Sequence, residues 1–511
     1  MMAGRSQQLR YLAAGAGGAL CGYVLHRPRK RRDHHGEEQV QTATETNHVY
    51  GPVQYDFEKA KLDSKLLVRE AQELSRSPGV TVSVGVNGQV VWSEGFGMAD
   101  VENRVACRPE SMMRIASISK PITMLLLARL WDAGMVDLDA PVQKYVPQFP
   151  KKRFNGEDVE VTTRMLVHHI AGVRHYTKAV PTVTGQDTVQ ANSSSSKPDN
   201  SNSGGTSESN SNDSNSACRD QNSKQSNSSQ VSGGDDVTLP EYHIMRHYDS
   251  VGESLELFAN DALCHRPGSK YLYTTHGWTL VSAVIEGAGG RPFTDQLADM
   301  LYQLGLEHIQ TELMEKLIDY RARCYQLDDK KQVVNSPYVD NSYKWAGGGL
   351  LATAEDIVEF GFCMLTAYFG KPIRKCEHTA VHPRPCPQCA PYIKDSTVKE
   401  MWTFHPATVK KKTGVGYGMG WEVAPDLKPD SKYSFATISH TGAAVGASSA
   451  LVIIPRSEKS PHSVVVGIIC NMESVDLEPT AQTIGQMFLQ EAAEQDRQKA
   501  SGLSKKSQVS Q

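Results

Sequence analysis

The chain has 511 residues, of which 39% are hydrophobic and 22% are charged, and its formal net charge is −3. This composition describes a folded soluble protein with the length of roughly three average domains, and it excludes a collagen, a coiled-coil rod, a multi-span membrane protein and a small disulfide scaffold. Because the chain has no excess of positive charge to displace phosphate counterions, nucleic-acid binding is excluded as well.

The first 32 residues contain no Asp or Glu. Within them an uncharged stretch, 11–25, is followed by a basic cluster that ends at Arg32. Such a segment is typical of a targeting sequence, and positive charge after the apolar stretch favours mitochondrial import over secretion. The stretch is shorter than a membrane-spanning helix, which needs about 20 residues. We expect residues 1–50 to form a mitochondrial targeting segment and a polar linker; a disordered tail or a weak membrane anchor is the alternative.

The next predicted elements are a helix and a hairpin. Apolar residues at near-helical spacing over 57–74 predict an amphipathic helix, with an apolar side formed by Leu62, Leu66, Leu67, Val68 and Leu74. Two β-branched stretches, 80–86 and 89–93, flank Asn87 and Gly88, and this arrangement indicates an antiparallel hairpin.

The rest of the chain completes an α+β fold. Strongly apolar stretches predict a helical lobe with a second core, at 121–133, 279–286 and 354–365. Near the C-terminus the pattern predicts three strands and a helix, at 435–439, 447–454, 463–470 and 479–498. We expect the two ends of a domain over 51–498 to share one antiparallel sheet flanked by helices, next to an all-helical lobe, with a polar tail at 499–511.

An insertion interrupts the lobe at about 182–237. Of the 45 residues from 191 to 235, 24 are Ser or Asn and none is aromatic. Such a segment cannot bury enough apolar surface to offset its chain entropy, so we expect a disordered loop.

A second insertion, about 374–391, is rich in Cys, His and Pro. Its paired cysteines and a nearby His suggest a zinc set of Cys376, His378, Cys386 and Cys389. Four prolines and the lack of a second paired module argue against it. We expect a surface loop without metal and keep zinc binding as the alternative.

The sharpest chemical signal is the pair Ser117 and Lys120 at the start of the apolar stretch 121–133. On a helix this spacing places both side chains on one face, so that a lysine amine can reach the serine hydroxyl and act as its base. The N-terminus of the helix adds backbone N–H groups that favour negative charge near the serine. By itself the pattern is weak, because any helix start with a Ser and a solvated Lys matches it.

Two further motifs follow in the chain. Tyr273 comes after a Pro-Gly turn and before an apolar helix, and it would complete a Ser/Lys/Tyr proton relay. His440, Thr441 and Gly442 lie at the end of one predicted strand, followed by the small residues 443–446 that a closely approaching substrate needs. The similar triplet at 412–414 lies in a Lys-rich loop, which we interpret as solvated.

Together these motifs resemble the Ser-x-x-Lys, Tyr-x-Asn and Lys/His-Thr-Gly motifs of the serine β-lactamase and penicillin-binding-protein superfamily, in the family's chain order and nearest to its class C type. Three supporting segments are similar to other family motifs: 166–173, 346–356 and 416–421. The resemblance implies a β-lactamase/transpeptidase-like fold and runs from about residue 78 to the last helix.

The resemblance also implies the roles of individual residues. Ser117 would be the acylated nucleophile, Lys120 its base or the stabiliser of a tyrosinate, Tyr273 the proton donor to the leaving group, and His440 an electrostatic support. The backbone N–H groups of Ser117 and Ala443 would form the oxyanion hole. The substrate would lie along the strand residues Thr441, Gly442 and Ala443.

One position departs from the family pattern. Thr275 stands where the Tyr-x-Asn motif has its Asn, so Lys120 or a substrate amide must be held differently. This puts β-lactam hydrolysis in doubt more than acyl transfer in general. The nearby His169 is interpreted as a structural loop residue, and His168, His175 and His276 receive no role.

The resemblance implies a mitochondrial serine peptidase of the intermembrane space that needs no cofactor. It would act on a peptide or small acyl substrate and regulate mitochondrial lipid metabolism, with association at the inner membrane and assembly into homo-oligomers, including filaments. Two alternatives stay open. One is an esterase, and the other is a filament-forming structural protein in which catalysis is auxiliary.

Overall fold

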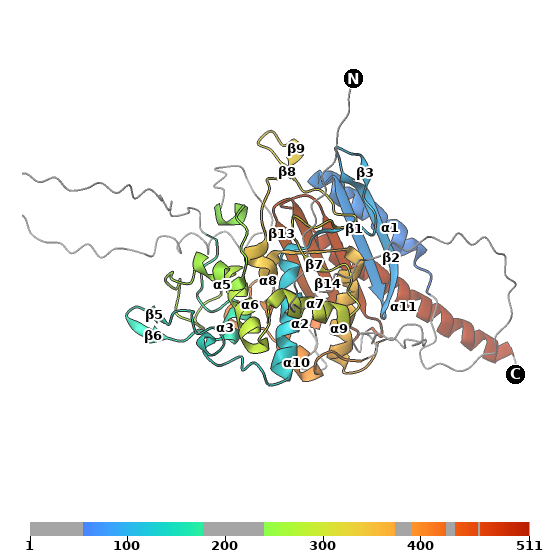
Figure 1. The fold of residues 1–511 in the computed structure, drawn as a ribbon. Helices are drawn as coiled ribbons and strands as arrows, with labels where there is room; N and C mark the ends of the chain where they lie inside the picture. Colours follow the sequence, from blue (N-terminus) through green and yellow to red (C-terminus); the bar gives the residue numbers. More distant parts are fainter. Residues whose placement is uncertain (1–54, 177–239, 374–389, 426–434, 458–459, 510–511) are drawn as a thin grey trace, which may run out of the picture. The chain divides into compact units, whose positions relative to one another are not determined.

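The computed structural model describes residues 55–176, 240–373, 390–425, 435–457 and 460–509 (Figure 1). They belong to one compact unit, Pro52–Gln511. Its centre is an eight-stranded sheet in the order β11-β12-β13-β14-β15-β1-β2-β3, with every neighbouring pair antiparallel. The strands are β1 Gly79–Val86, β2 Gln89–Asp100, β3 Val105–Ala106, β11 Gly416–Tyr417, β12 Glu422–Pro425, β13 Phe435–Ala444, β14 Ala447–Ile454 and β15 Val464–Cys470. The expected sheet shared by both ends of the chain is confirmed, since β1 pairs with β15.

The predicted hairpin joins β1 to β2. Its two turn residues, Asn87 at φ 51° and Gly88 at φ 86°, both adopt the left-handed backbone of a tight type I′ turn. One strand prediction was too short, however. β13 was expected to end at residue 439, but it continues to Ala444 because its small residues pair with β14 as far as Ala447. The His440 motif therefore lies inside a strand.

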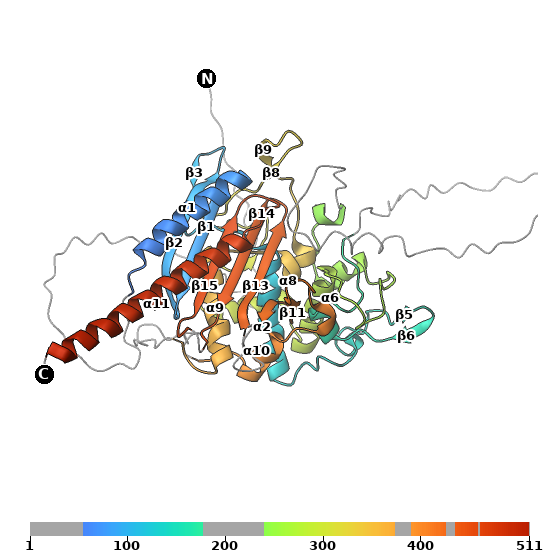
Figure 2. The ribbon, with the colours of Figure 1, turned by 180° about the vertical axis from the view of Figure 1, so that it is seen from behind.

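Two helices, α1 Glu58–Ser75 and α11 Glu478–Val509, cover one face of the sheet (Figure 2). The α1 helix is confirmed, but its predicted apolar side is only partly right. Leu67 and Val68 face the core as predicted, whereas Leu62, Leu66 and Leu74 are exposed. The small residues Ala60 and Ser64 also lie on the buried side. Small side chains allow α1 to pack closely on α11, where Ser64 Oγ contacts Met487 Sδ at 3.7 Å. The α11 backbone also runs past the predicted end at 498, through part of the polar tail.

The other face of the sheet carries the helical lobe. Its main helices are α2 Ser119–Asp132, α6 His276–Gly289 and α9 Ala354–Phe369. α9 lies directly on β1 and β15, where a Cβ at Gly85 would be 2.2 Å from the Phe362 ring and one at Gly467 would be 2.6 Å from Ile357. The expected second core exists, but it is not separate from the sheet, because the same apolar cluster contains Val465 of β15.

Short elements fill the loops. The small strands are β4 Met113–Arg114, β10 Leu350–Ala352 and β7 Gln310–Thr311 in one sheet, β5 Lys152–Phe154 with β6 Glu157–Val159, and β8 Tyr325–Leu327 with β9 Val333–Asn335. The short helices are α3 Thr163–Val167, α5 Val251–Ser254, α7 Phe293–Gln303, α8 Trp345–Gly348 and α10 Asp395–Met401. The 3-10 turns are η1 Ala116–Ile118, η2 Val142–Lys144, η3 Pro240–His243, η4 Leu255–Leu257, η5 Ser342–Lys344 and η6 Pro406–Thr408. The α+β fold class is confirmed.

Several predictions fall outside the described residues: the targeting segment and linker 1–50, the insertion 182–237, and the candidate zinc ligands Cys376, His378, Cys386 and Cys389. Within the described ranges, no helix combines the length and the apolar character that crossing a membrane requires. The same part of the chain contains no cluster of three or more His, Cys, Asp or Glu side chains that could hold a metal ion.

Candidate active site

A pocket of about 270 Å³ opens where η1, the end of β13, α8 and η5 meet. Four predicted site residues line it, Ser117, Tyr273, Thr441 and Ala443, together with residues that the sequence did not single out. The pocket therefore lies at the sheet edge where the three sequence motifs converge.

Close backbone packing positions Ser117. A Cβ at Gly442 would lie 2.4 Å from the Ile115 carbonyl oxygen, so the lack of a side chain there allows η1 to contact β13. Ser449 Oγ donates to the same carbonyl at 2.8 Å. Ala116, just before the serine, has φ 48°, a left-handed conformation that costs roughly 1–2 kcal/mol in a non-glycine residue. This backbone exposes Ser117 in part, while its neighbours on both sides are buried.

Lys120 reaches Ser117 across the first turn of α2. Its Nζ donates to Ser117 Oγ at 3.0 Å and to the Gly347 carbonyl at 2.6 Å. The side chain is fully buried. Burial lowers the pKa of Lys120 well below the ordinary lysine value, and the positive charge of Lys344 lowers it further. The amine therefore favours its neutral form, which can accept a proton.

Tyr273 completes this set. Its phenol hydrogen-bonds with Ser117, and its ring centroid lies 4.7 Å from Lys120 Nζ. Burial raises the pKa of the phenol well above its usual range, and the hydrogen bond with Ser117 only partly opposes this. Tyr273 is thus held as a neutral phenol, able to donate a proton.

Gly347 lies against Thr275, the residue at the Asn position of the Tyr-x-Asn motif. Thr275 packs on α8 so tightly that a Cβ at Gly347 would lie 2.7 Å from Thr275 Cγ2. The carbonyl of Gly347 then accepts the second hydrogen bond of Lys120. A backbone carbonyl therefore holds Lys120 beside Thr275.

His440 lies beside the pocket rather than in its lining. Its Nδ1–H donates to the Thr441 carbonyl at 2.6 Å, which leaves Nε2 to accept from the Tyr417 hydroxyl at 2.9 Å. Burial and the nearby Lys120 lower its pKa to about 3. At neutral pH His440 therefore carries no positive charge to support the relay. Tyr417, its partner, comes from the segment 416–421 that resembled a family motif without receiving a role.

The remaining predicted residues lie along β13. Thr441 and Ala443 line the pocket, and Gly442 between them faces η1. The described part of β12 pairs with β13 only as far as Ser439, so the β13 residues next to the pocket lie beyond this pairing. The oxyanion role of Ala443 stays a prediction.

His169 packs behind the relay. Its buried ring lies 4.3 Å from the Tyr273 ring and 4.8 Å from the Tyr417 ring, between centroids. Burial lowers its pKa well below the ordinary histidine value, so it is uncharged at neutral pH. His169 thus supports Tyr273 through packing, in line with the structural role expected from the sequence.

Lys344 also lines the pocket, although no sequence motif pointed to it. Its Nζ lies 5.0 Å from the ring centroids of Tyr242 and Tyr343 and 5.7 Å from that of Tyr176. Burial, and then the charge of Arg114, lower its pKa to about 7. Only the tertiary fold brings these residues together, so no sequence spacing could have predicted the group.

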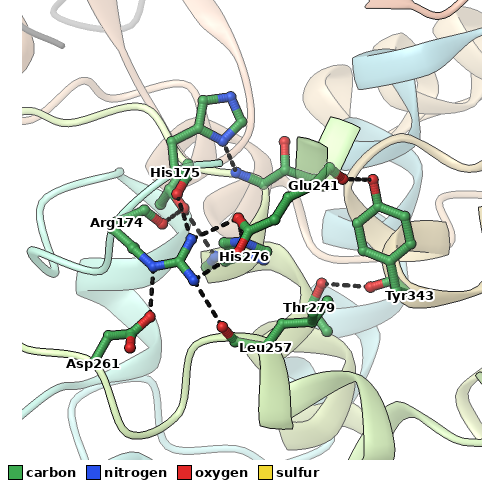
Figure 3. Close-up of polar contacts among 11 residues, drawn as sticks. Arg174, His175, Glu241, Leu257, Asp261, His276, Thr279 and Tyr343 are labelled. Carbon is green, nitrogen blue, oxygen red and sulfur yellow. Dashed lines mark hydrogen bonds and ion pairs between the residues drawn. The ribbon is translucent and has the colours of Figure 1, made fainter. Parts of the chain in front are cut away.

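Arg174, Glu241 and His276 form a buried ion network next to the pocket (Figure 3). Arg174 donates to both carboxylate oxygens of Glu241, at 2.7 and 2.9 Å, and His276 Nε2 lies 3.1 Å from the same carboxylate. Burial acts to raise the pKa of Glu241, but the hydrogen bonds from His276 and Arg174 outweigh it and hold the pKa at about 2. The network joins the described segments on either side of 177–239, and thereby places Tyr176 and Tyr242 in the pocket wall.

Comparisons with known proteins agree with this fold. An antiparallel sheet flanked by helices, next to a helical lobe, is the fold of β-lactamase-like serine hydrolases. The family described as Beta-lactamase matches residues 66–484, and the chain belongs to this family. The expected membership is thereby confirmed.

Two relatives and one solved structure show how far the similarity extends. The mitochondrial serine β-lactamase-like protein LACTB of Mus musculus is 39% identical over 468 residues, with 87% of this chain and 83% of the relative covered. LACTB of Homo sapiens is 38% identical, with 84% and 80% covered. A class C β-lactamase structure superposes with a TM-score of 0.56 at 14% identity, covering 86% of this chain and 98% of that one.

Proposed function

We propose that the protein is a mitochondrial serine hydrolase that forms an acyl-enzyme on Ser117 and cleaves amide bonds in peptides. The observation that carries the proposal is the 3.0 Å contact between Ser117 Oγ and the amine of Lys120. A fully buried amine with a lowered pKa is a suitable general base for a serine hydroxyl at neutral pH.

In the first step, Ser117 Oγ attacks the substrate carbonyl while its proton passes to Lys120 Nζ. The negative carbonyl oxygen is stabilised by the backbone N–H groups of Ser117 and Ala443. The phenol of Tyr273 then protonates the leaving amine, and Lys120 returns its extra proton to the phenolate. Lys120 and Tyr273 are therefore both neutral again when hydrolysis of the acyl-enzyme starts. They can then activate water in the way that they activated Ser117.

The opposite pKa shifts favour one of the two roles that the resemblance left open for Lys120. Burial makes the lysine a neutral amine and keeps Tyr273 a neutral phenol. A tyrosinate stabilised by a charged lysine would need both shifts to have the other sign. We therefore assign the base to Lys120 and the leaving-group acid to Tyr273.

An esterase is the second candidate within the same mechanism. Ester leaving groups depart without full protonation, so esters depend less on Tyr273 than amides do. The family resemblance favours peptides.

The cellular part of the proposal rests on the family and its named relatives. The two relatives of Mus musculus and Homo sapiens are named mitochondrial, which supports a mitochondrial location. The intermembrane space, an association with the inner membrane, homo-oligomers or filaments, and a role in lipid metabolism are proposed from the resemblance alone. A purely structural filament protein predicts the same assembly without the chemistry.

The test is hydrolysis of fluorogenic peptide amides by the purified protein and by Ser117→Ala. We expect the variant to lose turnover and to keep its oligomeric state. Ser396→Ala, an exposed serine in α10, is the matched control and keeps full activity. Equal turnover by Ser117→Ala and the unaltered protein would refute the assignment of Ser117.

A further inference from the structure

Within the described part of the chain, the buried side chain of Lys344 forms no ion pair, although Glu312 and Glu473 are near enough to raise its pKa. The side chain is 4% exposed, and within the described residues no oxygen accepts a hydrogen bond from Nζ. Its Nζ makes cation–π contacts with three tyrosine rings. A charge buried in this way is costly unless something compensates it.

The two carboxylates near Lys344 are used elsewhere. Glu312 accepts from Arg114 Nε at 2.8 Å and also from Asn341. Glu473 accepts from the backbone N–H of Gly446 at 3.2 Å. The positive charge of Lys344 therefore remains available to a ligand.

That ligand would lie in the same pocket as the nucleophile. Lys344, Ser117 and Tyr242 all line it, and the charge of Lys344 is near enough to lower the pKa of Lys120. The tyrosine rings surround the ammonium and exclude water, which strengthens its attraction for an anion. A ligand that bridges the two residues would place its acyl carbonyl at Ser117 and its anionic group at Lys344.

We propose that Lys344 binds a free carboxylate of the substrate, so that the pocket selects acyl compounds that carry a second carboxyl group. The inference rests on the proposed function, because it names the substrate class of the same site. A carboxylate has the single charge that one ammonium matches, whereas phosphate sites usually combine several donors, with Arg or clustered backbone N–H groups.

The kinetic test uses 4-nitroanilides of succinic, glutaric and adipic acid. Each is compared with the analogue in which a primary amide replaces the free carboxyl group, so that shape is kept and charge is lost. We expect the best diacid to have a kcat/KM about 10-fold or more above its amide analogue, as one well-placed ion pair provides. The chain length of that diacid reports the span from Ser117 to Lys344.

Variants assign the preference to one side chain. Lys344→Met keeps the length of the side chain and removes its charge, and we expect the ratio of the two kcat/KM values to fall towards 1. Lys344→Arg keeps the charge and retains part of the preference. Lys59→Met is the matched control, since that side chain is 79% exposed on α1, and its ratio stays as in the unaltered protein.

A binding measurement separates the inference from the proposed chemistry. Glutarate is titrated calorimetrically into Ser117→Ala and into the double variant Ser117→Ala/Lys344→Met, after both are shown to unfold cooperatively. We expect the double variant to bind at least about 10-fold more weakly. Equal binding by the two proteins, or no binding by either, would overturn the carboxylate site.

The kinetic test and the binding measurement distinguish failure of the proposed hydrolase activity from failure of the proposed carboxylate site. If glutarate binding depends on Lys344 but no anilide or peptide is cleaved, the proposed hydrolase activity is wrong and the carboxylate site stands. If neutral anilides are cleaved without any preference for the diacids, the hydrolase stands and the carboxylate site is wrong.

Discussion

Two buried lysines define the chemistry of the pocket at the scale of single residues. Burial lowers the pKa of both Lys120 and Lys344. Lys120 is hydrogen-bonded to the serine, and Lys344 lies against the rings of Tyr242 and Tyr343. The first arrangement suits a base, and the second suits an ion-binding residue.

The lowered pKa of Lys120 predicts the pH dependence of acylation. Only the neutral amine accepts the serine proton, so the rate rises with pH until Lys120 has lost its proton. Because the folded protein lowers this pKa, the rate constant for fluorophosphonate inactivation levels off well below pH 10.4, the pKa of an ordinary lysine.

The control for this profile is Lys120→Met, which we expect to react about 10²- to 10⁴-fold more slowly and to lose the rising limb. A rate that keeps increasing tenfold per pH unit up to about pH 10 would show that Lys120 has an ordinary pKa.

Tyr273→Phe tests the leaving-group acid. We expect the kcat/KM for a peptide amide to fall by about 10²- to 10⁴-fold, and that for the matched 4-nitrophenyl ester to fall far less, because nitrophenolate leaves without a proton. Steady-state kinetics on the two substrates measure the difference. An equal loss on both would assign Tyr273 to activation of Ser117 instead.

At the scale of elements, the contact between β13 and η1 controls the site. In Gly442→Ala the new Cβ would lie 2.4 Å from the Ile115 carbonyl oxygen, so η1 must move and carry Ser117 with it. A displacement near 1 Å lowers the rate of acylation by about 10²-fold. Inactivation kinetics and thermal unfolding measured together separate misplacement from loss of the fold.

Gly252→Ala is the comparison, because the nearest atom to its Cβ would be 3.8 Å away. We expect it to react at the normal rate. A Gly442→Ala protein that also reacts normally would show that η1 has room to adjust.

The elements also show what the sequence could and could not predict. The hairpin at Asn87 and Gly88 was predictable, since turn chemistry and β-branching agree locally. The buried side of α1 was predictable only in part, at Leu67 and Val68, because α11 approaches from more than 400 residues away and favours small residues such as Ser64. Periodicity alone instead favoured Leu62 and Leu66, which are exposed.

The same distinction holds for the candidate site. Ser117 and Lys120 are three residues apart, so helix geometry alone predicts their contact. Tyr273 was found through its resemblance to a family motif. Lys344 has no local pattern, and only the folded chain places it in the same pocket as Ser117.

For the whole molecule, buried neutral histidines predict loss of stability in acid. Burial lowers the pKa of His168 to about 4 and that of His440 to about 3, and the pKa of His169, His175 and His276 is lowered too. At pH values between these lowered pKa values and about 6.5, the pKa of an unfolded histidine, the unfolded chain binds more protons than the folded one. The stabilisation is therefore complete above about pH 6.5 and is lost as the pH falls.

Thermal unfolding from about pH 7.5 to 4.5 checks this sign. We expect the Tm to fall over the range, and His168→Gln to reduce the dependence while keeping a donor for the Tyr417 carbonyl. His308 is a control that should change the pH dependence in the opposite direction. Asp356 raises the pKa of His308, so protonated His308 stabilises the folded protein in acid. His308→Gln should steepen the fall. A Tm independent of pH would contradict neutral burial of these histidines.

The most direct test of the whole account is the site of covalent labelling by a fluorophosphonate. The purified protein is labelled at about pH 8 and digested, and mass spectrometry locates the adduct. We predict one adduct, on Ser117, which is absent in Ser117→Ala and strongly reduced in Lys120→Met. No adduct on a cooperatively folded protein, or an adduct on another residue, would contradict an acyl-enzyme at Ser117.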